Sequence, residues 1–171
     1  MKELILGGAR SGKSALAMQR ALASAKEVTF IATATAGDAE MASRIAHHKA
    51  DRPSHWKLIE EPIALADVLL KHADEQSCLL VDCLTLWLSN LLGNEGFDEA
   101  QFIHQRDHLL KLLPQLPGHI IFVSNEVGFG ITPMGSISRR FIDEAGRLHQ
   151  QLASLCDQVT LTVAGLPLAL K

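Results

Sequence analysis

An eight-residue glycine-rich motif near the N-terminus constrains this sequence more than any other feature. Residues 7–14 read GGARSGKS and match G-x-x-x-x-G-K-[ST], the phosphate-binding loop. An apolar run at 4–6 precedes the motif, and an amphipathic helical pattern follows it. Because a phosphate-binding loop connects a strand to a helix, this context predicts a nucleotide site at the start of an α/β domain.

The residue types within the motif fit the chemistry of phosphate binding. Glycines at 7, 8 and 12 allow backbone N–H groups to approach phosphate oxygens, and the following helix directs its positive N-terminal end at the same anion. Lys13 is expected to contact the β- and γ-phosphates, and the Ser14 hydroxyl is expected to ligate Mg²⁺. The predicted loop consists of Gly7, Gly8, Ala9, Arg10, Ser11, Gly12, Lys13 and Ser14.

Apolar runs alternate with helical patterns along the rest of the chain, which predicts a mostly parallel sheet flanked by helices. The expected strands lie at 4–6, 28–32, 78–81, 120–124 and 159–163, with a last short strand at 168–170. A chain of 171 residues without repeats or linkers has the length of one domain. The sequence therefore predicts an α/β fold in a single nucleotide-binding domain that spans residues 1–171.

Composition narrows the class of partner. The net charge is −3 and 47% of the residues are hydrophobic, which is typical of a compact globular protein and gives no basis for a nucleic-acid partner. The three cysteines show no metal-binding spacing, which fits buried thiols in a reducing compartment. No apolar run reaches the roughly 18 residues of a membrane span, and the first strand leaves no room for a signal peptide, so we expect a cytoplasmic protein.

Polar residues follow two of the predicted strands at the edge where an α/β sheet binds its ligands. Thr33, Ala34 and Thr35 follow the second strand and are expected to line the nucleotide site. The alternative for this segment is an ordinary loop with Asp38 as the N-cap of a helix. Asp82 ends the third strand, where it is expected to hold Mg²⁺, and its alternative role is the N-cap of the next helix.

A predicted helix over 38–52 carries a ridge of basic side chains. Arg44, His48 and Arg52 recur every four residues, which places them on one face. Neighbouring arginines disfavour the charged form of the histidine, so its neutral imidazole is available as a nucleophile while the arginines bind phosphate. The alternative is a solvent-exposed basic face without a catalytic role.

Three further segments offer candidate ligand contacts. Glu60 or Glu61 is expected either to contact a base or ribose hydroxyl or to face solvent. The glycine-rich stretch at 125–133 follows the fourth strand and is predicted to be a substrate loop. Arg139 and Arg140 open the next predicted helix and either bind phosphate or face solvent.

Longer segments accompany the phosphate-binding loop in a fixed order. They are GGARSGKS (7–14), IAT (31–33), EMAxRI (40–45), HKADRP (48–53) with Trp56 and Glu60, VDCLTLWLSNLL (81–92) and VSNEVGxGIxP (123–133). The loop is shared by many families, whereas the last three segments are far more specific. Together they cover essentially the whole chain, which resembles the bifunctional adenosylcobinamide kinase / adenosylcobinamide-phosphate guanylyltransferase family of cobalamin biosynthesis.

The resemblance implies two reactions at one nucleotide site in a RecA-like P-loop NTPase fold. In the first, the hydroxyl of the aminopropanol arm of adenosylcobinamide takes the γ-phosphate of GTP or ATP. In the second, GTP transfers GMP to a histidine and releases pyrophosphate, and the phosphorylated cobinamide then displaces the histidine as adenosylcobinamide-GDP. No general base for the first reaction is evident in the sequence.

The resemblance also implies the residues and partners of the site. The guanylylated histidine corresponds to His48 rather than His47, and Lys13 with Mg²⁺ offsets the charge on the departing pyrophosphate. The implied partners are a small corrinoid substrate and further copies of the chain in a homotrimer, with no nucleic acid and no membrane span. The implied nucleotide contacts beyond the loop are Thr33, Ala34, Thr35, Lys49, Ala50, Asp51, Arg52, Glu60 and Asp82.

Two other interpretations stay open at this point. One is a P-loop kinase of another small metabolite without guanylyl transfer, in which His48 is an ordinary surface residue. The other is a RecA-like nucleic-acid ATPase or a GTP switch. The net charge of −3 stands against the nucleic-acid ATPase. The absence of an Asn-Lys-x-Asp guanine-binding motif stands against the GTP switch.

Overall fold

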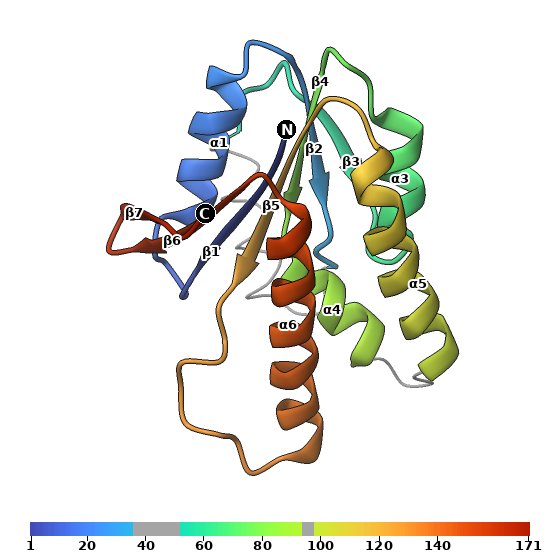
Figure 1. Ribbon diagram of the computed structural model, residues 1–171, viewed down its shortest axis with the longest axis vertical. Helices are drawn as coiled ribbons and strands as arrows, with labels where there is room; N and C mark the ends of the chain where they lie inside the picture. The colour runs from blue at the N-terminus through green and yellow to red at the C-terminus, as the bar shows by residue number, and fades with distance from the viewer. Residues whose placement is uncertain (36–51, 94–97) are drawn as a thin grey trace.

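The computed structural model describes residues 1–35, 52–93 and 98–171, and these form one mixed sheet with helices on both faces (Figure 1). The strand order is β3-β2-β4-β5-β1-β6-β7. All neighbouring strands pair in parallel except β6 and β7, which form an antiparallel hairpin. The strands are β1 (Lys2–Gly7), β2 (Glu27–Ala32), β3 (Lys57–Glu60), β4 (Ser77–Asp82), β5 (His119–Asn125), β6 (Gln158–Val163) and β7 (Leu166–Ala169).

The sheet divides the hydrophobic core into two layers, one on each of its faces. Because successive side chains of a strand point to opposite faces, Leu4 packs with α3, α4, α5 and α6, whereas its neighbour Ile5 packs with α1. Figure 1 shows α1 apart from the group formed by the other helices. The helices are α1 (Lys13–Ala23), α3 (Leu65–His72), α4 (Leu84–Leu92), α5 (Glu99–Leu112), the short 3₁₀ helix η1 (Leu113–Gln115) and α6 (Ser136–Leu155).

The predicted strands are confirmed, and each coincides with or overlaps an observed one. The start of α6 was predicted wrongly, since the helix begins at Ser136 and not at Arg139. Its first turn is exposed, with Ile137 73% accessible, so the apolar period that signals a helix begins only further along the chain. In the described ranges, no helix is both long and apolar enough to cross a membrane.

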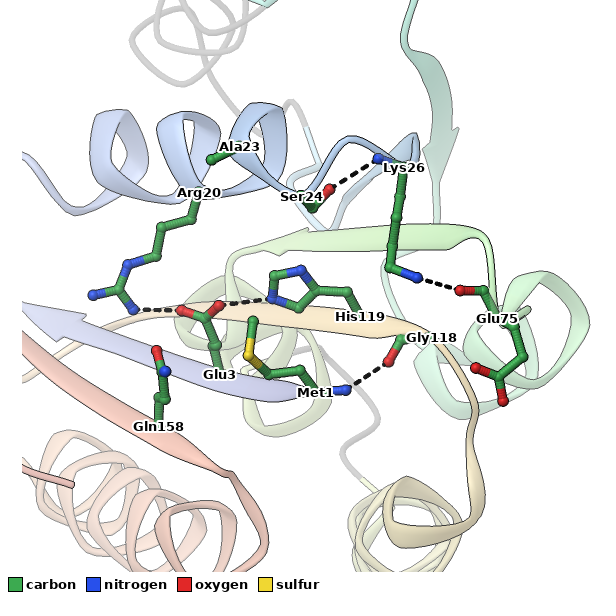
Figure 2. A pocket seen from close by; sticks show the side chains of 10 residues that line it. All are labelled: Met1, Glu3, Arg20, Ala23, Ser24, Lys26, Glu75, Gly118, His119 and Gln158. Carbon is green, nitrogen blue, oxygen red and sulfur yellow. Dashed lines mark hydrogen bonds and ion pairs between the residues drawn. The ribbon is translucent and has the colours of Figure 1, made fainter.

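A buried ionic cluster joins the elements at the amino edge of the sheet (Figure 2). Glu3 on β1 is 2% exposed, and its carboxylate lies 2.7 Å from Nε2 of His119 and pairs with Arg20 of α1. Arg20 also donates to the Thr160 hydroxyl on β6 at 2.9 Å. Burial acts to raise the pKa of Glu3, but the hydrogen bonds with His119 and Arg20 outweigh it and hold that pKa below its ordinary value. The cluster therefore ties α1 to three strands.

Candidate functional site

The phosphate-binding loop lies at the carboxyl edge of the sheet, between the end of β1 and the start of α1 (Figure 1). Strand β1 pairs with β5 on one side and β6 on the other, and β4 lies beyond β5. The register places Gly7 beside Asn125, and Val123 beside Asp82. The loop, the end of β5 and Asp82 therefore share one edge, which is where open α/β sheets bind their ligands.

Backbone packing explains two glycines of the loop. A Cβ at Gly7 would lie 2.4 Å from Ser11 Oγ and 2.6 Å from the carbonyl oxygen of Thr162. Gly12 has φ +95°, which favours glycine, and a Cβ there would lie 3.1 Å from a backbone atom of the β6–β7 turn. At Gly8 a Cβ would meet no heavy atom within 4 Å, so packing within the chain does not require that glycine.

The β6–β7 hairpin supports the loop from the side. The N–H of Gly165 donates to the carbonyl of Ser11 at 2.9 Å. Ala164 and Gly165 have φ values of 51° and 80°, which are the left-handed conformations that a tight hairpin turn needs. The C-terminal hairpin therefore holds the N-terminal loop, a contact for which the sequence carries no signal.

Lys13 links the two motifs predicted from the sequence. Its Nζ donates to the carbonyl of Gly8 at 3.0 Å, and the residue is 9% exposed. Burial lowers the pKa of Lys13, and the negative charge of Asp82 opposes this shift. The ammonium of the phosphate-binding loop and the carboxylate at the end of β4 therefore belong to one site.

Asp82 is the last residue of β4, as predicted for a metal-binding carboxylate. Its alternative role as the N-cap of α4 is wrong, because Cys83 holds that position. Ser14 lies in the first turn of α1 and is half-buried. Within the ranges described, no group of three or more His, Cys, Asp or Glu side chains offers a metal site of its own. Two oxygen donors are instead the set that Mg²⁺ takes together with phosphate oxygens.

Thr33 follows β2 at the same edge, and its side chain is fully buried. Its hydroxyl donates to the carbonyl of Cys83 at 2.7 Å and accepts the N–H of Cys83 at 3.0 Å. It therefore joins the end of β2 to the segment that follows β4. Ala34 is half-buried and Thr35 is exposed. Contact of these three residues with a nucleotide stays a prediction.

The predicted nucleophile His48 and its neighbours at 49–51 lie outside the described residues. Arg52 is described, and its guanidinium lies 5.1 Å from the centre of the Phe30 ring on β2, within range of a cation–π contact. Glu60 is exposed at the carboxyl end of β3. Arg52 and Glu60 therefore lie on or beside the two strands at the β3 end of the sheet.

Three other charged candidates make local contacts. Glu61 Oε1 accepts two backbone N–H groups of the turn before α3, at 2.9 and 2.8 Å. Arg140 pairs with Glu99 of α5. Arg139 donates to two carbonyls of the loop before α6. Each of these contacts holds a turn, a helix or a loop in place.

A polar network that the sequence analysis did not find lies at the end of β5. Nε2 of His149 on α6 lies 2.8 Å from Ser124 Oγ, and its Nδ1 lies 3.5 Å from Glu126 Oε2. Ser124 Oγ is 3.2 Å from Thr85 Oγ1, which accepts the N–H of Asn125 at 2.7 Å. The β5 residues belong to a motif that the sequence did mark, but nothing in the pattern of α6 indicates that His149 joins them.

Solved structures share this fold at low sequence identity. The ATPase of a type III secretion system matches with a TM-score of 0.59 and 14% identity, over 98% of this chain and 56% of that one. The RadB recombinase matches with a TM-score of 0.50 and 17% identity, over 94% and 73%. Together with the parallel sheet and the loop at the end of β1, these likenesses confirm the predicted RecA-like P-loop NTPase fold.

Sequence relatives identify the family. Residues 3–170 match the family described as cobinamide kinase / cobinamide phosphate guanyltransferase. The chain is 57% identical over 171 residues to the bifunctional adenosylcobalamin biosynthesis protein CobP of Pseudomonas aeruginosa, covering 100% of this chain and 98% of the relative. It is 37% identical over 182 residues to the protein CobU of Salmonella typhimurium, covering the whole of both chains. The chain therefore belongs to the cobinamide kinase / cobinamide phosphate guanyltransferase family and is a bifunctional enzyme with these two activities.

Proposed function

We propose that both reactions use the one nucleotide site formed by the phosphate-binding loop and Asp82, within a single catalytic domain of residues 1–171. The observation that carries this proposal is the register of β1, β5 and β4, which brings the phosphate-binding loop and Asp82 to one edge of the sheet. In the first reaction the hydroxyl of the aminopropanol arm of adenosylcobinamide takes the γ-phosphate of GTP or ATP. Lys13 leaves the Gly8 carbonyl and offsets negative charge on the transferred group.

Mg²⁺ is proposed to bind between Ser14 and Asp82, because both present oxygen donors beside the loop. When bound, the ion offsets charge on the phosphates and helps to orient them. Lys13 and the loop N–H groups hold the same phosphates from the protein side.

Guanylyl transfer is proposed to run through His48. Its neutral imidazole attacks the α-phosphorus of GTP, the bond from that phosphorus to the bridging oxygen breaks, and pyrophosphate leaves. The terminal phosphate of the phosphorylated cobinamide then attacks the same phosphorus and the imidazole leaves. The proposed nucleotide contacts outside the loop are Thr33, Ala34, Thr35, Lys49, Ala50, Asp51, Arg52 and Glu60.

The enzyme is proposed to act as a cytoplasmic homotrimer. Support comes from large apolar side chains that are each more than half exposed, which is typical of surfaces that contact another protein. They are Phe129, Ile131 and Met134 between β5 and α6, Ile137 in the first turn of α6, and Val163, Leu166, Leu168 and Leu170 at the C-terminal hairpin.

Covalent labelling tests the histidine. The protein is incubated with Mg²⁺ and GTP labelled at the α-phosphorus, denatured, and assayed for retained label that is labile in acid and stable in base. We expect label in the parent and in His47→Ala, and none in His48→Ala. Label that disappears only in His47→Ala would move the site by one residue. An unlabelled parent that still binds GTP would refute the guanylyl-histidine.

A further inference from the structure

The network at the end of β5 contains a carboxylate that the reactions above leave without a role. Glu126 is the first residue after β5, and its side chain is 18% exposed. Its N–H donates to the carbonyl of Gly7 at 3.0 Å, so its backbone is fixed directly to the first residue of the phosphate-binding loop. It follows the strand that separates β1 from β4. The backbone of Glu126 therefore follows the strand that lies between the one leading into the phosphate-binding loop and the one ending at Asp82.

A buried histidine lies against the Glu126 side chain. His149 projects from α6 and is 6% exposed, and its Nδ1 lies 3.5 Å from Glu126 Oε2. Among the described residues Nδ1 has no hydrogen-bond partner, while Nε2 contacts Ser124 at 2.8 Å. Burial lowers the pKa of His149, and the charge of Glu126 only partly opposes this. A neutral imidazole at this distance lies against the carboxylate without cancelling its negative charge.

An apolar cavity lies beside the residue that follows Glu126. It measures about 370 Å³ and lies between the end of α4 and the start of α6. Val127, the residue after Glu126, lines it together with Leu92, Phe141 and Ile142. Phe141 and Ile142 are half-buried, because they face this cavity. The cavity therefore reaches the segment after β5 that carries Glu126.

We propose that Glu126 is the general base of the phosphorylation reaction and that His149 is its positioning residue, an inference that rests on the proposed function. Glu126 takes the proton of the substrate hydroxyl while that oxygen forms a bond to the γ-phosphorus. The bond from this phosphorus to its bridging oxygen breaks, and the electron pair leaves with the nucleoside diphosphate. The proton passes from Glu126 to solvent. Guanylyl transfer does not use this base, because its nucleophile is a neutral imidazole.

The competing interpretation is purely structural. Glu126 Oε1 accepts the N–H of Gly128 at 2.8 Å, so the carboxylate also orders the loop after β5. Glu61 offers a matched control, since it caps a turn through two backbone N–H groups at another strand end. Substitution by glutamine keeps one acceptor oxygen at either position and removes the negative charge and the basicity.

The test measures both reactions in Glu126→Gln and Glu61→Gln. We expect Glu126→Gln to lower kcat of phosphorylation by about 100-fold or more with little change in the KM for nucleotide. Labelling from α-labelled GTP stays within twofold of the parent. We expect Glu61→Gln to leave the rates of both reactions within threefold of the parent's rates. Phosphorylation within threefold of the parent in Glu126→Gln overturns the proposal, and so does an equal loss of both reactions. A parent that takes no label would instead contradict the guanylyl-histidine and leave the base testable by phosphorylation alone.

The double variant tests the role of His149. If His149 acts through Glu126, His149→Gln lowers phosphorylation on its own but adds less than about threefold to the loss in Glu126→Gln. Losses that multiply would show that His149 acts independently and would overturn its positioning role. Urea denaturation of each variant checks that the fold is retained, so that reduced activity is not read from an unfolded protein.

Discussion

At the residue scale, Lys13 shows how the phosphate site opposes stability. The residue is only 9% exposed, and burial lowers the pKa of its ammonium from an ordinary value of 10.5. The unfolded chain therefore binds more protons than the folded chain between the folded pKa and 10.5, so the free energy of unfolding rises with pH in that interval. At neutral pH the folded chain carries the full cost of the buried charge.

Lys13→Met is therefore expected to stabilise the protein while it removes activity. The Gly8 carbonyl keeps the N–H of Ser11 as a partner, so little is lost when the lysine is replaced. We expect Tm to rise by about 2–4 °C, which corresponds to ~1 kcal/mol in a chain of this size. Phosphorylation should fall by about 100-fold or more. Calorimetry at pH 7 and pH 9.5 measures the stability, and a Tm below that of the parent would contradict this account of the site.

The Glu3 cluster is expected to stabilise the folded protein, whereas the buried charge of Lys13 destabilises it. Because the folded pKa of Glu3 is depressed, its stabilising contribution is present above the unfolded value of 4.5 and is lost as pH falls through the folded value. Glu3→Gln leaves Arg20 and His119 without their buried carboxylate. We therefore expect the free energy of unfolding, measured in urea at pH 7, to fall by about 3 kcal/mol. The difference from the parent should shrink at low pH. Glu75→Gln, exposed at the same edge, serves as the control and should stay within about 0.5 kcal/mol.

At the scale of elements, the phosphate-binding loop depends on a hairpin from the far end of the chain. Gly7 has backbone of β6 against it, whereas Gly8 faces open space. We predict that Gly7→Ala lowers the free energy of unfolding by about 1–3 kcal/mol without nucleotide, because the loop or the hairpin has to shift. Gly8→Ala should change it by less than about 0.5 kcal/mol. Urea titration of the nucleotide-free proteins compares the two, and equal losses would contradict the hairpin's supporting role.

The elements themselves were largely predictable from the sequence. Leu79 and Leu80 of β4 are both fully buried, because helices cover both faces of a parallel sheet, and such strands are read directly as apolar runs. The loop and Asp82 were predictable because their chemistry fixes the residue types. The contact of Gly165 with the loop and the contact of His149 with Glu126 could not be predicted, because each joins segments that are remote in sequence. Local patterns carry no information about such tertiary neighbours.

At the scale of the whole molecule, the proposed reaction site and the buried ionic cluster lie at opposite edges of the sheet. Its carboxyl edge holds Lys13, Asp82 and Glu126, while its amino edge holds the buried ionic cluster. The exposed apolar side chains beside the carboxyl edge support the proposed assembly. We expect sedimentation equilibrium to give three times the chain mass of 18.6 kDa. A particle of one chain mass that carries out both reactions at full rate would contradict the homotrimer.

The central claim is that one nucleotide site serves both reactions, and competition by α,β-methylene-GTP tests it most directly. This analogue cannot donate GMP, because a carbon replaces the oxygen whose bond guanylyl transfer breaks. Phosphorylation is followed with GTP labelled at the γ-phosphorus, and self-guanylylation with GTP labelled at the α-phosphorus. A single site predicts competitive inhibition of both reactions with the same inhibition constant. Constants that differ by more than tenfold, or inhibition of only one reaction, would contradict the account.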